Sequence, residues 1–148
     1  MYSILIILLL FISSTADAIM DVISFHFSKS IFSKMHNWKI FKKKTYKEKL
    51  SIYRWCNPDY SWKNKWKNGN KEEGEIFKGS STIFVFVTDL WHLMQFIQLN
   101  SLFLLSVVFL LHLEESSFKS IILHIFLYRV YYGINFTLWY DHILKLKK

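Results

Sequence analysis

Three long apolar segments, separated by polar and basic stretches, constrain the fold of this 148-residue chain most strongly. They cover about residues 3–27, 81–113 and 118–140. A helix of roughly 20 apolar residues crosses the hydrocarbon core of a bilayer, and in lipid the backbone polar groups must be bonded within the protein. We therefore expect an all-α fold: a three-helix transmembrane bundle that forms a single membrane domain over residues 1–148.

The composition agrees with this expectation. Hydrophobic residues make up 52% of the chain, aromatic residues 19%, and the mean hydropathy is +0.18. One proline and four glycines leave little material for loops. Because Cys56 is the only cysteine, the sequence excludes an internal disulfide framework and a CxxC metal site.

The second apolar segment is longer than one crossing requires, with about 33 residues and no proline or glycine. We interpret it as one long tilted helix, or as a spanning helix whose first turns lie at the membrane interface. A break near Asn100 and Ser101 is the alternative.

The segment between the first two apolar stretches, about residues 28–80, is strongly basic. Between Val22 and Ser81 the chain has 14 Lys plus Arg and 5 Asp plus Glu, a net charge of +9, whereas the whole chain carries +8. Many tryptophans and tyrosines interrupt the lysines, which is unlike a disordered tail. We expect a compact, aromatic-rich cytoplasmic segment.

The first apolar segment allows two interpretations. Residues 4–12 resemble the apolar region of a signal peptide, with Ala16-Asp17-Ala18 as a cleavage site, although no lysine or arginine precedes them. A retained helix with its N-terminus outside would instead place the basic segment and the C-terminal lysines in the cytoplasm and Glu114-Glu115 outside, as the positive-inside rule requires. We favour a multi-pass protein of the cell membrane, in a bacterial inner membrane, with the C-terminus cytoplasmic.

Ionisable residues inside the apolar segments are the candidates for chemistry, because charges in a bilayer are costly and usually functional or paired. Asp89 and His92 are the candidate catalytic pair, and they would also be the ligands of a metal if there is one; the sequence identifies no cofactor. Asp17, Asp21, Gln95 and Arg129 complete a predicted intramembrane polar cluster. The alternative is purely structural: Arg129 pairs with Asp89, and His92 donates a hydrogen bond to a neighbouring helix.

Lysines near the membrane are candidates for contact with anionic lipid or phosphate. They are Lys42, Lys43, Lys44, Lys63, Lys65 and Lys67. Lysine mixed with aromatic residues also occurs in proteins that bind nucleic acid, but a tether between two membrane helices favours lipid. Residues 80–82 could cap the second helix and bind a phosphate there. His112 and His124, on either side of the outer turn, are a weaker candidate metal pair.

We expect a small integral membrane protein with a structural role, or one that binds lipid, a second copy or another membrane protein. The chain contains no HExxH, GxSxG, Walker or GxGxxG motif. A membrane-embedded enzyme that uses Asp89 and His92 on a lipid or lipid-linked substrate is the first alternative, so the sequence leaves enzymatic activity open. A component of proton-linked transport is the second.

Residues 20–32, 61–69 and 79–92, which include Ser61-Trp-Lys-Asn-Lys-Trp-Lys-Asn-Gly69, resemble a family of small uncharacterised bacterial integral membrane proteins. The resemblance covers roughly residues 20–95. It implies a membrane location and a retained first helix. It implies no reaction, cofactor or substrate.

Overall fold

A computed structural model describes residues 2–37, 52–113 and 117–146 of the chain. Three long helices dominate it: α1 (Tyr2–His26), α4 (Leu90–Leu113) and α5 (Phe118–Thr137), which continues into the π-helical turn η7 (Leu138–Leu144). Outside helices and turns, the described part contains only two isolated bridges, Ser30 to Lys145 and Trp66 to Glu75. The predicted all-α three-helix bundle is confirmed.

Short helices fill most of the described chain between α1 and α4. They are η1 (Phe27–Lys29), η2 (Ile31–Asn37), α2 (Ile52–Cys56), α3 (Pro58–Ser61), η3 (Trp62–Lys65), η4 (Lys67–Gly69), η5 (Lys71–Glu73) and η6 (Val85–Val87). We call residues 52–88 the juxtamembrane unit. Its turns have clear local causes: Asn57 caps α3 by accepting a hydrogen bond from the N–H of Asp59 at 2.9 Å, and Pro58 occupies the first helical position.

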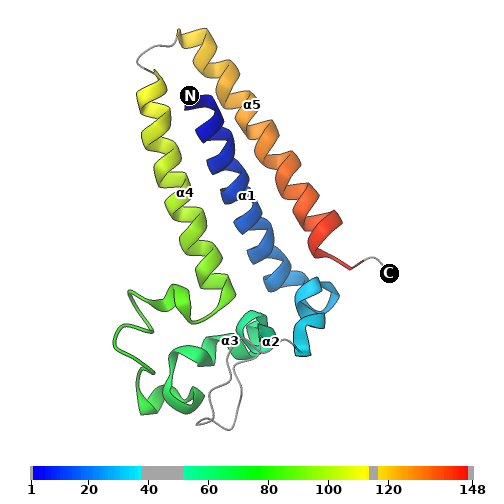
Figure 1. Ribbon diagram of the computed structural model, residues 1–148, viewed down its shortest axis with the longest axis vertical. Coiled ribbons are helices and arrows are strands. Elements are labelled where there is room, and N and C mark those ends of the chain that lie inside the picture. Colours follow the sequence, from blue (N-terminus) through cyan, green and yellow to red (C-terminus); the bar gives the residue numbers. More distant parts are fainter. Residues whose placement is uncertain (1, 38–51, 114–116, 147–148) are drawn as a thin grey trace.

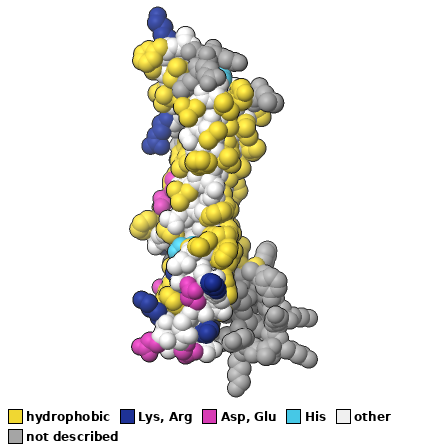
Figure 2. Space-filling view, turned by 90° about the vertical axis from the view of Figure 1, so that its left-hand side faces the viewer, with side chains coloured by type: hydrophobic (Ala, Val, Ile, Leu, Met, Phe, Trp, Pro, Cys, Tyr) yellow, Lys and Arg dark blue, Asp and Glu magenta, His cyan; other side chains and the backbone are white. Residues whose placement is uncertain are grey.

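The described residues include three helices that are long and apolar enough to cross a membrane: Tyr2–Lys29, Leu90–His112 and Phe118–Leu144. Figure 2 shows hydrophobic side chains along the helical part of one face, whereas charged side chains gather toward the end that holds the juxtamembrane unit. These features make the chain a multi-pass membrane protein.

The central helix of the bundle is α1, which lies between α4 and α5 (Figure 1) and packs against both. It runs antiparallel to α4 and in the same direction as α5. Two clusters of buried residues form the core. One lies near the start of α1 (Ile6, Leu9, Leu10 and Val108), and the other lies where α1 meets the juxtamembrane unit (Ala18, Val22, Ile23, Phe32, Cys56, Leu90 and Leu144).

The predicted bounds were accurate for two helices and wrong for the other. The first helix was expected over 3–27 and is observed over Tyr2–His26, and the last begins at Phe118 as expected but becomes π-helical after Thr137. The second was expected from residue 81 and begins only at Leu90. Residues 82–87 are all β-branched or aromatic, and such residues have a low helix propensity. Asp89 then accepts a hydrogen bond from the backbone N–H of His92 and caps α4 at its start. The break considered near Asn100 is absent, since α4 is continuous there.

Cys56 tests the packing of the juxtamembrane unit against α1. Its side chain is only 2% exposed, and burial raises the pKa of its thiol to about 12. Because the thiolate is the reacting form, we expect maleimide labelling of Cys56 at pH 8 to be slow in the folded protein and fast after denaturation. A Cys56→Ser, Glu72→Cys variant is the control, since Glu72 is exposed. Equal labelling rates at the two positions would contradict the observed packing.

Candidate functional site

The candidate catalytic pair forms the start of α4. Asp89 is 2% exposed, and its Oδ1 accepts a hydrogen bond from the backbone N–H of His92 at 2.9 Å. The Nδ1 atom of His92 lies 2.8 Å from Oδ1 and 2.7 Å from Oδ2 of the same carboxylate. The hydroxyl of Thr88 lies 3.2 Å from Oδ2. Asp89 is therefore the N-cap of α4, and a carboxylate is also favoured at the positive end of a helix.

This arrangement corrects two sequence predictions. Asp89 was expected inside the second helix but precedes α4, whereas His92 and Gln95 do lie on that helix. In the structural alternative, Asp89 was expected to pair with Arg129 while His92 bonded a neighbouring helix. The Asp89 carboxylate instead contacts His92 and Thr88, both close in sequence, because capping brings them together. Chemically, a carboxylate on Nδ1 fixes the orientation of an imidazole, as it does in catalytic dyads.

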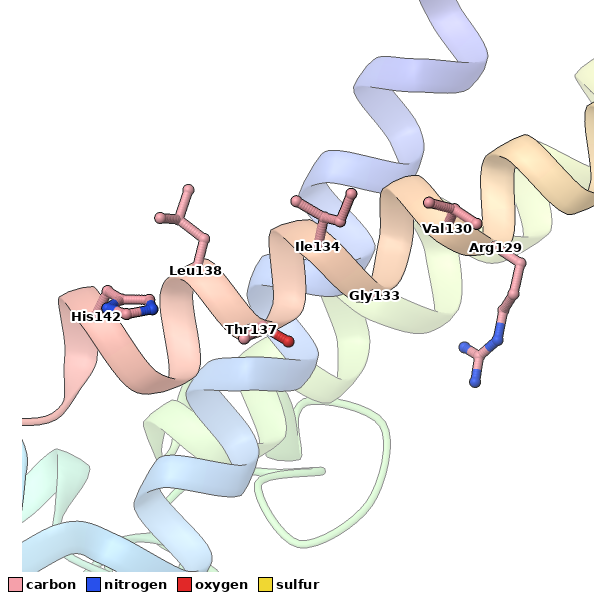
Figure 3. Close-up of a pocket in the computed structure, with 7 residues that line it drawn as sticks. All are labelled: Arg129, Val130, Gly133, Ile134, Thr137, Leu138 and His142. Atoms are coloured by element: carbon pink, nitrogen blue, oxygen red, sulfur yellow. The ribbon is translucent and has the colours of Figure 1, made fainter.

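Arg129 lies on the outer face of α5 and is exposed. Within residues 2–37, 52–113 and 117–146 it forms no ion pair or hydrogen bond. Figure 3 shows its side chain extending away from the helix beside a shallow groove of about 540 Å³. The groove follows one face of α5 and η7 and is lined by Arg129, Val130, Gly133, Ile134, Thr137, Leu138 and His142. The predicted Arg129–Asp89 pair is therefore wrong for the described chain.

The two aspartates of α1 lie on one side of that helix, half-buried. Tyr132 on α5 donates its hydroxyl hydrogen bond to Oδ2 of Asp17 at 2.9 Å. Asp21 lies one turn further along α1, and Gln95 is half-buried on α4. The predicted polar cluster is thus divided: Asp17 faces α5, Asp89 caps α4 and contacts His92, and Arg129 points outward.

A buried polar contact that the sequence analysis did not select joins α1 to α5. The side-chain amide of Asn135 donates to the Ser14 hydroxyl at 2.5 Å, to Thr15 Oγ1 at 3.2 Å and to the Phe11 carbonyl at 3.2 Å. Ser14 in turn donates to the Leu10 carbonyl at 2.8 Å. The available signal was an asparagine in one apolar segment and the run Ser13-Ser-Thr15 in another, since such residues often bond between membrane helices.

The predicted phosphate position at residues 80–82 already holds an internal carboxylate. Oε2 of Glu75 accepts from the N–H of Gly79 at 2.8 Å, and Oε1 accepts from the N–H of Ser81 at 3.0 Å and from the Ser81 hydroxyl. These bonds, above all that from the Ser81 hydroxyl, hold the pKa of Glu75 below its ordinary value. Gly79 has φ +85°, which glycine adopts without strain, and no helix begins here.

The described lysines of the predicted lipid site lie on the juxtamembrane unit. The Nζ atom of Lys63 lies 5.4 Å from the ring centre of Trp62, which is within cation–π range. The carbonyl of Lys65 accepts bonds from the Ile76 N–H at 3.0 Å and the Ser80 hydroxyl at 2.7 Å, and Lys67 is exposed. Lys42, Lys43 and Lys44 lie outside the described residues.

The histidines at the other end of the bundle do meet. The rings of His112 and His124 are 5.5 Å apart, edge to face, and Nδ1 of His124 lies 3.2 Å from the Ser120 hydroxyl. Across the described ranges, no group of three or more His, Cys, Asp or Glu side chains could hold a metal ion. Asp89 with His92, and His112 with His124, therefore each offer two protein ligands.

Glu75 predicts a pH-dependent stability. Its pKa is lowered in the folded protein, so the carboxylate stabilises the fold above its ordinary pKa of 4.5, and this contribution disappears as the pH falls through the lower folded value. We expect Glu75→Gln to lower the melting temperature at pH 7, with the difference from the parent protein vanishing in acid. Glu72→Gln, at an exposed neighbouring position, should show no such difference. A pH-independent effect of Glu75→Gln would contradict this assignment.

The N-cap at Asp89 predicts graded effects of substitution. Asp89→Ala should lower the free energy of unfolding by about 1–2 kcal/mol because it removes the cap of α4. Asp89→Asn should lower the free energy of unfolding by less, since asparagine caps helices well. In the Asp89→Asn background, the further substitution His92→Ala should lower it little more. Denaturant titration in detergent would measure these effects, with the exposed Asp59→Ala as control. Equal stability of Asp89→Ala and the parent would refute the capping role.

Searches against protein-family models, curated proteins and solved structures found no match to this chain. The resemblance of residues 20–32, 61–69 and 79–92 to small bacterial membrane proteins therefore stays a prediction.

Proposed function

We propose that this protein acts by binding rather than by catalysis, as a small integral membrane protein whose juxtamembrane unit contacts the headgroups of anionic lipids. One observation carries the proposal: side chains from the first part of the unit are bonded to its last residues, just before α4. The Trp55 indole donates to the Val87 carbonyl at 3.4 Å, and the Asn64 amide donates to the Thr88 carbonyl at 3.1 Å. Both acceptors lie within three residues of the first residue of α4.

These contacts support a lipid-facing role for the lysines of the unit. Lys63 and Lys65 flank Asn64, and Lys67 follows two residues later. The bond from Asn64 to Thr88, two residues before the membrane span, therefore keeps all three near the boundary. A lysine near an anionic surface contributes about 1 kcal/mol of attraction, which falls off within a Debye length. A tethered unit gains that attraction without the entropy cost of folding on the membrane.

The proposed orientation follows from charge. With the N-terminus outside, the basic segment of about residues 28–80 and the C-terminal lysines lie in the cytoplasm, where bacterial inner membranes would present anionic lipid to them. This orientation is supported by the net charge of +9 between Val22 and Ser81. In the fold, α1 and α5 run in the same direction, and both end on the side of the bundle where the juxtamembrane unit lies (Figure 1).

The enzyme alternative, with a lipid or lipid-linked substrate, rests on the contact between Asp89 and His92. The Nδ1–carboxylate geometry would suit a general base, but helix capping accounts for the same contact. The transport alternative rests on the bond between Tyr132 and Asp17, which joins two ionisable groups across α1 and α5. The enzyme alternative requires access for a substrate, whereas Asp89 is 2% exposed. The binding proposal needs no such access.

Anionic lipid provides the test. We expect nanodiscs of phosphatidylcholine with phosphatidylglycerol to raise the melting temperature above that in phosphatidylcholine alone. The variant K63Q/K65Q/K67Q should lose that difference, which corresponds to at most about 3 kcal/mol for three lysines.

The matched control is K63R/K65R/K67R, which keeps the three charges and should keep the preference for phosphatidylglycerol. High salt should reduce the preference in the parent protein, because surface charges are screened. An unchanged preference in the glutamine variant would overturn the proposal.

A further inference from the structure

The segment shortly before α4 is apolar and exposed, and only its last three residues, the single turn η6, are helical. We call residues 76–87 the apolar wedge. It contains no acidic residue, and Lys78 is its one charge. Ile83 is 77% exposed, and Phe84 and Val87 are each about half exposed. Ile76 and Phe77 are exposed as well. Five exposed large apolar side chains within twelve residues mark an interaction surface.

The wedge lies beside the first turns of α4. In Figure 1 it is the green segment that leads into the lower end of that helix. The ring of Phe86 stacks on Phe96 with centroids 4.3 Å apart and planes 18° apart. Phe96 is six residues beyond Leu90, which at 1.5 Å per residue is about 9 Å along the axis of a membrane-spanning helix. The wedge therefore reaches the level at which α4 itself is expected to contact lipid.

The backbone of the wedge suits a low-dielectric environment. Non-helical chain is tolerated at membrane depth only where its polar groups are bonded within the protein or face water. Eight of the twelve backbone N–H groups of the wedge are bonded inside the protein, those of Ile76, Gly79, Ser80, Ser81, Thr82, Phe84, Val85 and Val87. Two of these bonds go to the Glu75 carboxylate, and a third joins Ile76 to Lys65.

The shape of the wedge is also fixed. A Cβ atom on Gly79 would lie 3.1 Å from the ring of Phe84, so the ring packs directly over the glycine. The Gly79 carbonyl accepts from the N–H groups of Thr82 and Phe84 at 3.1 and 2.8 Å. An ordered loop exposes its apolar side chains without a further entropy cost of ordering.

We propose that the apolar wedge inserts into the interfacial region of the same bilayer that α4 crosses, with Ile83, Phe84 and Val87 among the lipid chains. Its occupant is lipid, because the wedge is continuous with the lipid-facing surface of α4 and carries no acidic group. Lys78 has a long apolar stem that can reach the headgroups from this position. The proposal rests on the membrane location assigned under the proposed function, but it does not require the lysines of the juxtamembrane unit.

Depth-dependent quenching tests the insertion. In a Cys56→Ser background, a polarity-sensitive fluorophore is attached at Ile83→Cys, or in a second variant at Val87→Cys, and the protein is placed in vesicles of phosphatidylcholine and phosphatidylglycerol. We expect a blue-shifted emission, several-fold stronger quenching by spin-labelled lipid than at the control position, and protection from aqueous iodide. The control is Glu72→Cys, which is exposed on the same unit.

The outcomes separate the two proposals. Equal iodide quenching at positions 83, 87 and 72 would overturn the wedge, even if the preference for phosphatidylglycerol persists. Lipid quenching at 83 and 87 in the K63Q/K65Q/K67Q background would support the wedge whatever the preference of that variant. Using both label positions keeps the test valid if one substitution disturbs the fold.

Discussion

The rest of the structure depends on where α4 begins, and one side chain sets that point. A helix that starts at a membrane boundary has N–H groups in its first turn without helical partners, and these are costly to leave unbonded in lipid. Asp89 accepts one of them, from His92, and also holds the His92 ring. Because the helix begins at Leu90, the preceding residues are free to fold back along its first turns. The apolar wedge and the position of the juxtamembrane unit both follow from the position of this cap.

The bundle is held together by α1, whose small and hydroxyl residues allow close approach of its neighbours. Ser13, Ser14, Ala16 and Ala18 are all buried. Within a bilayer, helices gain little from burying apolar surface against one another, so close packing and interhelical hydrogen bonds carry more of the association. Asn135 supplies such bonds from α5 to two hydroxyls of α1. A central helix of this kind explains why two flanking helices that lie on opposite sides of it form one unit.

The sequence predicted the number, order and type of the long helices because that information is carried by length and hydropathy. It did not predict which charged groups meet. Asp89 and His92 are three residues apart, a spacing that suits a helix face and an N-cap equally well, so the spacing alone could not place Asp89 outside α4. The predicted Arg129–Asp89 pair was wrong because α5 is apolar on most of its surface. The sequence of such a helix does not indicate which of its faces packs against the neighbouring helices. The Glu75 contact depends on a turn at Gly79 that brings residues 75, 79 and 81 together.

Three acidic side chains of this fold are bonded by other groups of the protein, and none of them is bonded by Arg129. Asp89 is bonded by the first turn of its own helix, Glu75 by its own turn, and Asp17 by Tyr132. None of these three carboxylates pairs with a lysine or arginine in the described chain, and none of them lies in an ion pair with Arg129. An arginine near the centre of a span costs about 2.5–3.5 kcal/mol on insertion scales, less if its stem carries the guanidinium toward the headgroups. This cost makes the outer face of α5 energetically distinct from that of α4, which contains no Asp, Glu, Lys or Arg.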